Sequence, residues 1–197
     1  MKPIRVVAMG KAEPRFLDAA RAALAREYGS ATTYTRRRVD PAFALHGERN
    51  QYHSTEILEQ LTKLEDDGSV IVAVGDVDLY IPILTFVFGE AHLGGRCAVV
   101  SYHRLLQEFY GLPRDDRLGA ERLAKTAVHE AGHVFGLTHC DDYECVMAAS
   151  HSVEWMDLKG TTLCPTCREQ LSISRAISQQ LVPRSLTTSR RDNRRHQ

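Results

Sequence analysis

The chain has 197 residues, enough for a single domain with a large core, and its 25 Lys and Arg balance its 25 Asp and Glu. The zero net charge argues against nucleic acid as a partner, and the apolar runs are too short for a helix that spans a membrane. The first residues lack the apolar stretch of a signal peptide, so we expect a cytoplasmic protein.

The first part of the chain alternates between strand and helix patterns. Apolar side chains recur at helical spacing before Gly29 and again after Ser54, which is a suitable cap. The expected elements are strands at 4–9, 31–36 and 70–75, helices at 13–29 and 54–65, and a long loop at 37–53. Because Val70–Gly75 is continuously apolar, we expect a mostly parallel sheet covered by helices on both faces.

Two further strands, at 84–88 and 97–101, are separated by a short glycine-rich link that favours a hairpin. One strand of this pair should therefore run antiparallel to the rest of the sheet. Beyond the helix described next, we expect a loop at 148–163 and a closing helix from Cys167 to Leu181. The tail at 183–197 has five Arg and few apolar residues, which predicts a disordered, solvated segment.

A metal-binding pattern follows a run that has the composition of a helix. His129 and His133 are four residues apart, with Glu130 between them. Residues at this spacing lie on one face of a helix, so both imidazoles can reach the same metal ion. Gly136 can adopt the left-handed conformation that ends the helix and turns the chain back, which brings His139 in as a third ligand.

Three histidine ligands leave one position open for water, which is the arrangement of a catalytic zinc and differs from that of a closed structural zinc. The full pattern, HExxHxxGxxH followed by Met147, is the metzincin pattern with its Met-turn. In this interpretation Met147 is no ligand, and its turn supports the floor beneath the imidazoles. A polar, solvated helix face is the weaker alternative.

Four cysteines close to this pattern predict a second zinc. Cys164 and Cys167 have the two-residue spacing of a zinc knuckle, and Cys140 and Cys145 supply the other pair. Two disulfides or a redox-active CxxC are alternatives, and the expected reducing compartment disfavours the first of them. Because Cys140 follows His139 directly, the second zinc would also hold the segment that delivers the third histidine.

Taken together, HEAGHVFGLTHC, the Cys145-Val-Met147 turn and Cys164-Pro-Thr-Cys167 resemble the archaemetzincins, a family of metzincin-type zinc peptidases with an added four-cysteine zinc site. The resemblance covers roughly residues 70–172. It implies a metzincin-like α/β (α+β) fold: a twisted, mostly parallel five-stranded sheet with one antiparallel edge strand, covering helices, an active-site helix, a Met-turn and a C-terminal helix. By the same resemblance, Leu84–Gly89 is the edge strand that pairs with substrate.

The implied organisation is one catalytic domain at 1–182, with an upper part at 1–136 and a lower part at 137–182 that holds the Met-turn and the cysteines. We therefore expect a metallopeptidase with two zinc ions per chain that cleaves peptide or protein substrates, with Glu130 as general base. An amidohydrolase acting on a small amide, or a zinc-stabilised interaction module, are the alternatives. Glu130 argues against the module, because zinc binding does not require it.

The remaining polar residues have simpler interpretations. Histidine outside a recognised pattern is usually a surface residue or a hydrogen-bonded core residue. His92, His103 and His151 could line the cleft, but this simpler interpretation is favoured for them. Three others lie in polar segments and are expected at the surface: His46, His53 and His196. Cys97 begins a predicted strand and is expected to be a small buried apolar residue.

Overall fold

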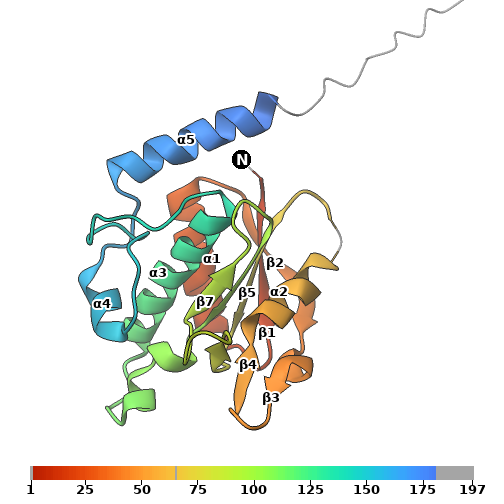
Figure 1. Cartoon of the computed structure of the whole chain (residues 1–197), viewed down its shortest axis with the longest axis vertical. Helices are drawn as coiled ribbons and strands as arrows, with labels where there is room; N and C mark the ends of the chain where they lie inside the picture. Colours follow the sequence, from red (N-terminus) through yellow and green to blue (C-terminus); the bar gives the residue numbers. More distant parts are fainter. Residues whose placement is uncertain (1, 65, 181–197) are drawn as a thin grey trace, which may run out of the picture.

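The computed structural model describes residues 2–64 and 66–180, and a five-stranded sheet with the order β2-β1-β5-β8-β7 lies at its centre (Figure 1). The strands are β1 (Ile4–Met9), β2 (Thr32–Val39), β5 (Val70–Gly75), β7 (Gly89–Ala91) and β8 (Cys97–Ser101). β2, β1, β5 and β8 pair in parallel, whereas β7 pairs antiparallel with β8 at the edge. This confirms the expected mostly parallel sheet with one antiparallel edge strand.

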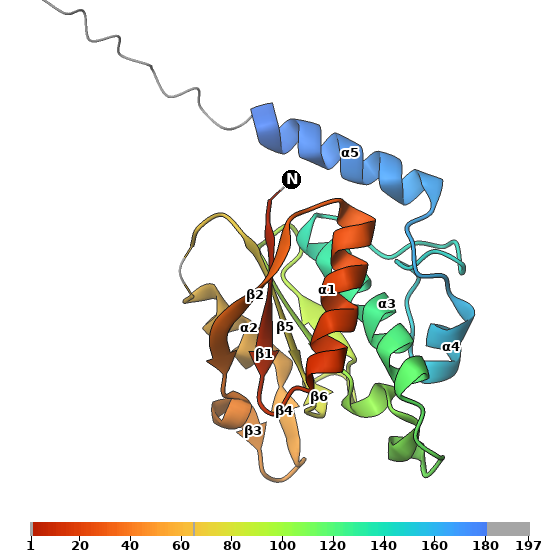
Figure 2. The ribbon, with the colours of Figure 1, turned by 180° about the vertical axis from the view of Figure 1, so that it is seen from behind.

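Helices cover both faces of this sheet. α1 (Pro14–Tyr28) and α3 (Asp116–Val134) pack side by side on one face, and α2 (Ser54–Thr62) covers the other (Figures 1 and 2). Successive side chains of a strand point to opposite faces. In β5, Val70, Val72 and Val74 accordingly pack with α1 and α3, while Ile71 and Ala73 pack with α2. The continuous apolar sequence of this strand follows from burial on both sides.

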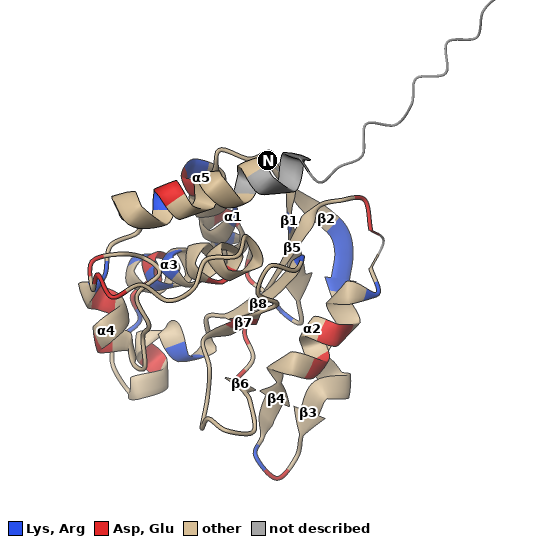
Figure 3. Cartoon of the chain, turned by 45° about the horizontal axis from the view of Figure 1, so that its top comes forward, with Lys and Arg blue, Asp and Glu red and all other residues tan. Residues whose placement is uncertain are grey.

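The prediction of a loop at 37–53 is wrong in part, because this stretch contributes to a second, smaller sheet. The elements are a 3₁₀ helix η1 (Pro41–Ala44) and a three-stranded sheet of β3 (Leu45–His46), β4 (Gln51–His53) and β6 (Leu79–Tyr80). Strands of two or three residues are too short to show a hydrophobic period, and their pairing is decided by tertiary contacts. The β3–β4 hairpin projects beside α2 at one end of the molecule (Figures 1 and 3).

The antiparallel strand also lies later in the chain than expected. Residues 84–88 are not a regular strand, and within them only Val87 forms a single antiparallel bridge, to Leu79. The strand is β7, at Gly89–Ala91, because Gly89 can approach the carbonyl of Val99 more closely than a residue with a Cβ. Residues 84–88 remain free to line a cavity.

Smaller differences concern the helices. Ser54 is the first residue of α2 and does not cap it: its hydroxyl donates to the carbonyl of Tyr80 at 3.1 Å and to the Glu90 carboxylate. The loop at 148–163 contains α4 (Val153–Leu158), and the closing helix α5 begins earlier than expected, at Pro165, and is described to Gln180. The tail at 183–197 lies outside the described residues.

Two other expectations remain predictions, namely the division at residue 136 into upper and lower parts and the absence of nucleic acid partners. Charged residues of both signs are spread along the chain, with basic residues on β2 and acidic ones on α2 (Figure 3). In residues 2–64 and 66–180 there is no helix that is both long and apolar enough to cross a membrane.

Candidate active site

The end of α3 presents the histidine pattern as the sequence predicts. The helix begins after Asp115, whose carboxylate accepts a hydrogen bond from the Leu118 amide at 2.9 Å, and continues to Val134. Gly136 has a φ of +91°, and the amide of Leu137 donates back to the carbonyl of Gly132 at 2.9 Å. This turn reverses the chain and returns it over the histidine face of the helix.

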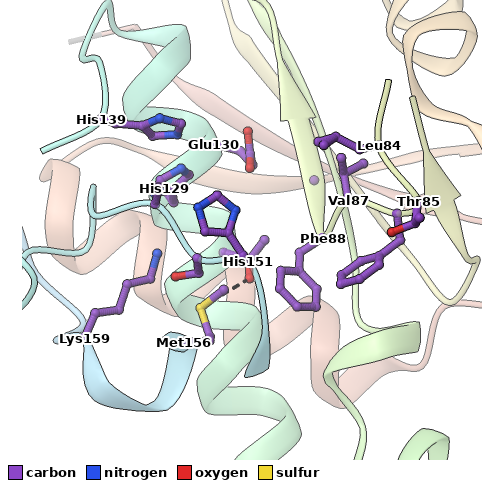
Figure 4. Close-up of a pocket in the computed structure, with 15 residues that line it drawn as sticks. Leu84, Thr85, Val87, Phe88, His129, Glu130, His139, His151, Met156 and Lys159 are labelled. Atoms are coloured by element: carbon purple, nitrogen blue, oxygen red, sulfur yellow. Dashed lines mark hydrogen bonds between the residues drawn. The ribbon is translucent and has the colours of Figure 1, made fainter. Parts of the chain in front are cut away.

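The three predicted imidazoles converge. Their ligand atoms all lie within 4.8 Å of one another, and the Nε2 atoms of His129 and His133 are 3.1 Å apart. The ring of His139 lies 5.3 Å from that of His129 and 5.0 Å from that of His133, measured between ring centroids. Figure 4 shows His129 and His139 grouped above the cavity beside Glu130.

Hydrogen bonds determine which ring nitrogen of His129 and of His133 is available to bind a metal ion. His129 Nδ1 faces the carbonyl of Val146 at 2.9 Å, and His133 Nδ1 faces the carbonyl of Leu137 at 2.8 Å. A carbonyl oxygen only accepts, so each Nδ1 carries the proton and each Nε2 holds a lone pair. Two lone pairs that face each other at 3.1 Å repel unless a cation lies between them. The residues therefore fit a metal ion held by their Nε2 atoms.

The protonation states agree with this fit. Burial lowers the pKa of His129 well below its usual value, and the charges of Lys159 and His133 lower it further. Burial also lowers the pKa values of His133 and His139. All three rings are thus held neutral near pH 7, which is the form that binds metal.

Glu130 points into the same cavity. Its residue is 7% exposed, and burial raises the pKa of its carboxyl to about 8, against the opposing effect of Lys159. The side chain lies against β7: a Cβ added to Gly89 would come within 2.7 Å of Glu130 Cγ. A buried carboxyl with a raised pKa beside a candidate metal centre is suited to proton transfer.

The cavity itself has a volume of about 350 Å³ (Figure 4). One wall is the irregular segment 84–88 with Gly89, and the other is formed by α3, the turn at 149–151 and α4. Phe86, Phe88 and Met156 give it an apolar part. Phe88 also belongs to the core, and His151 is exposed and lines the cavity.

Sequence reasoning missed Lys159. This lysine is 3% exposed, lines the cavity, and donates to the carbonyl of Ala148 at 2.9 Å. Burial lowers the pKa of its ammonium to about 8, while the nearby Glu130 raises it. A lysine in a polar loop carries no signal of burial in the sequence, so only the tertiary structure places this cation beside the histidines.

Met147 lies directly beneath α3. Its side chain is fully buried, and its sulfur packs so closely on Gly132 that a Cβ added there would overlap it. The neighbouring carbonyl, that of Val146, is the acceptor for His129. The turn at 145–148 therefore supports the histidine face through both a side chain and a carbonyl.

The four cysteines predicted to bind a second zinc also converge. The Sγ atoms of Cys140 and Cys164 are 3.8 Å apart, as are those of Cys145 and Cys167, and all four lie within 4.8 Å of one another. For a Zn–S bond of about 2.3 Å, the edge of a tetrahedron is also close to 3.8 Å, well beyond the roughly 2.05 Å of a disulfide. This separation fits a tetrahedral metal site.

Backbone amides point at these sulfurs. Cys145 Sγ accepts from the amides of Met147 at 3.4 Å and Cys164 at 3.3 Å, and Cys164 Sγ accepts from the amide of Cys167 at 3.5 Å. The last of these lowers the pKa of the Cys164 thiol, whereas burial raises the pKa values of Cys145 and Cys167. Buried thiols of this kind ionise only when a cation compensates the charge, as a bound metal ion would.

A model of peptidase family M54 matches residues 32–173. The chain belongs to peptidase family M54. The archaemetzincin of Methanocaldococcus jannaschii is 44% identical to it over 131 residues, which are 66% of this chain and 72% of that protein. The protein is therefore a zinc metallopeptidase. Its resemblance to the archaemetzincins is confirmed.

Solved structures of similar proteins have the same fold. The crystal structure of the archaemetzincin from Methanopyrus kandleri matches with a TM-score of 0.76 at 31% identity, covering 89% of this chain and 96% of that one. The structure of a zinc-dependent peptidase from Methanocorpusculum labreanum matches with a TM-score of 0.77 at 28% identity, covering 85% and 99%. The α/β fold inferred from the sequence is that of these proteins.

Replacing Gly89 tests how closely the wall of the cavity packs against Glu130. In Gly89→Ala the new Cβ would lie 2.7 Å from Glu130 Cγ and 2.8 Å from the carbonyl of Val99, so Glu130 must move. A displacement of this size is expected to lower kcat/KM for a peptide about 100-fold while the zinc content stays unchanged. Gly47→Ala is the control, because nothing lies within 4 Å of its Cβ. Equal activity of the two variants would contradict this account of the wall.

Proposed function

We propose that His129, His133 and His139 hold a catalytic zinc and that Glu130 acts as the general base of peptide hydrolysis. The observation that supports this most is the pair of Nε2 atoms that face each other at 3.1 Å with both Nδ1 atoms committed to backbone carbonyls. Zinc, when bound, supplies a Lewis acid that lowers the pKa of a water molecule toward about 7 and polarises the scissile carbonyl.

The protein's own residues would carry the proton. Glu130 adjoins the ligand His129, and its carboxylate takes a proton from the attacking water and passes it to the leaving amine. The carboxyl of Glu130 is enclosed by Gly89 on one side and lies in the field of Lys159 on the other. Lys159 opposes the effect of burial, so it keeps part of the Glu130 population ionised and able to accept a proton.

Substrate would lie along the wall formed by residues 84–89. β7 is the edge strand of the sheet, and the wall leads directly into it. The backbone groups of an edge can pair with an extended peptide, and the side chains of Phe86 and Phe88 would face an apolar residue of that peptide. An extended peptide uses more of this wall than a small amide would, which favours a peptidase over an amidohydrolase.

We also propose that Cys140, Cys145, Cys164 and Cys167 hold a structural zinc, which gives two zinc ions per chain. Elemental analysis of the purified wild type should then find two zinc equivalents, and His129→Ala should lose one of them. His92→Ala is the matched control, because His92 lies outside both groups. One equivalent in the wild type, or no loss in His129→Ala, would overturn the assignment.

A further inference from the structure

A third group of metal-ligating side chains lies away from the cavity. His46, His53 and Glu56 each offer a ligand atom, and these atoms lie within 4.8 Å of one another. Neither the catalytic nor the four-cysteine group includes them. His46 and His53 were expected to be ordinary surface histidines, but only His46 is exposed and His53 is half-buried.

Two rules of local geometry bring the three residues together. In the β3–β4 hairpin His46 pairs with Gln51, so His53, two residues further on, is its diagonal neighbour on the same face. His53 is also the N-cap residue of α2, and Glu56 lies three residues later in the first turn of that helix. The hairpin supplies one imidazole, the helix supplies the carboxylate, and His53 joins the two elements.

The distances are those of a metal centre. Glu56 Oε1 lies 3.3 Å from His46 Nε2 and 3.1 Å from His53 Nδ1. For ligand bonds of about 2.0–2.1 Å, the edge of a tetrahedron is about 3.3–3.4 Å. The corresponding Nε2 separation between His129 and His133 is 3.1 Å. The third group is thus as closely spaced as the catalytic pair.

The rings are held in place before any ion arrives. Tyr80, which is 5% exposed, lies 5.5 Å from the ring of His46 and 5.2 Å from that of His53, between centroids. The pairing of His53 with Tyr80 between β4 and β6 fixes this arrangement. His53 Nε2 is buried with no hydrogen-bond partner among the described residues, so the polar side-chain contact of this ring is directed at Glu56.

We propose that His46, His53 and Glu56 form a third metal site, which takes a divalent late first-row transition ion such as zinc. Two imidazoles and one carboxylate are the donor set that suits these ions, and His46 leaves the site open to water as a further ligand. Arg49, in the same hairpin, has its guanidinium engaged elsewhere: it stacks on Tyr80 at 4.1 Å and donates to the carbonyls of Leu84 and Thr85.

The same contacts connect this site to the catalytic cavity. Arg49 donates to the carbonyl of Thr85 at 3.1 Å, and Gln51 Nε2 donates to it at 2.9 Å, so the hairpin holds the cavity wall. From the helix side, Thr55 donates to Glu90 of β7 at 2.9 Å. An ion that joins the hairpin to α2 would therefore stiffen both ends of the wall along which the peptide is proposed to lie.

The test is a zinc titration of the two-zinc protein against a colorimetric zinc chelator, with His46→Ala and Glu56→Gln beside the wild type. The wild type should take up one further equivalent, and both variants should lose it. His92→Ala, which removes a histidine outside the site, should retain it. No uptake by the wild type, or the same uptake by all four proteins, would overturn the proposal and leave an ordinary His–Glu ion pair.

A second measurement separates this site from the proposed catalytic one. His129→Ala should lose the catalytic zinc and still bind the additional equivalent at the third site, because none of the third site's ligands lies in the cavity. Filling the site in the wild type should raise the melting temperature of the protein, whereas Glu56→Gln should show no such rise. A rise of the same size in Glu56→Gln would show that zinc stabilises the protein from another position and would count against the site.

Discussion

Replacing Glu130 with Gln is expected to lower kcat for peptide hydrolysis by about 10²- to 10⁴-fold and to leave the zinc content at the wild-type value. Gln has nearly the same shape as Glu, so the packing against Gly89 is preserved. It cannot accept the proton of the attacking water, and His129 and His133 are oriented by backbone carbonyls and not by Glu130. Turnover with a peptide substrate and elemental analysis of the same preparations would measure both quantities.

The control for this variant is Glu121→Gln, which removes a carboxylate from the same helix at a half-buried position with ion pairs to Arg117 and Lys125. It should retain activity. Activity of Glu130→Gln close to that of Glu121→Gln would show that the buried carboxylate is not the base. That result would favour a binding role for the cavity.

Thermal unfolding of the zinc-free proteins gives a check that Glu130→Gln is folded. Burial raises the pKa of Glu130 to about 8 in the folded protein, above its usual 4.5. The stabilisation from this raised pKa is complete below pH 4.5 and is lost as the pH rises to about 8. The Gln side chain of the variant does not titrate, so the variant does not lose stability in this pH range. Zinc-free Glu130→Gln should therefore be at least as stable as the wild type at pH 8. A lower melting temperature there would indicate damaged packing.

Replacing Cys164 with Ala is expected to remove the structural zinc and, in addition, to weaken binding of the catalytic zinc about 10- to 100-fold. The two sites share one stretch of chain. Cys140 follows His139 directly, and Cys145 precedes Val146, whose carbonyl accepts from His129 Nδ1 at 2.9 Å. The amide of Cys140 also donates to the carbonyl of Met147 at 3.1 Å. Loss of the sulfur site would therefore loosen the groups that position two histidines.

Competition with a chelator of known zinc affinity would measure the zinc affinity of the catalytic site in Cys164→Ala and in the wild type. Cys97→Ala is the control, because Cys97 is a buried core residue of β8 and contributes to no metal group in the described part of the chain. If Cys164→Ala bound the catalytic zinc as tightly as Cys97→Ala does, the two sites would be independent. The coupling between them would then have to be abandoned.

The sequence alone predicts what depends on spacing along the chain. His129 and His133 lie on one face of a helix because of the helical period, and Gly136 ends that helix because it can adopt a positive φ. The knuckle of Cys164 and Cys167 is equally local. β5 is recognisable because a strand covered on both faces must be apolar throughout. Each of these features is fixed by residues within a few positions of one another.

The tertiary structure decided what depends on contacts between distant segments. The antiparallel strand is at Gly89–Ala91, and not at 84–88, because Gly89 fits against Val99 of the neighbouring strand and against Glu130, which is far away in the sequence. Lys159 becomes a buried cation only because the turn at 148 folds over it. The hairpin that joins His46 to His53 consists of strands too short to show a period. Close packing selects these arrangements, and packing is a property of the folded chain that no local pattern encodes.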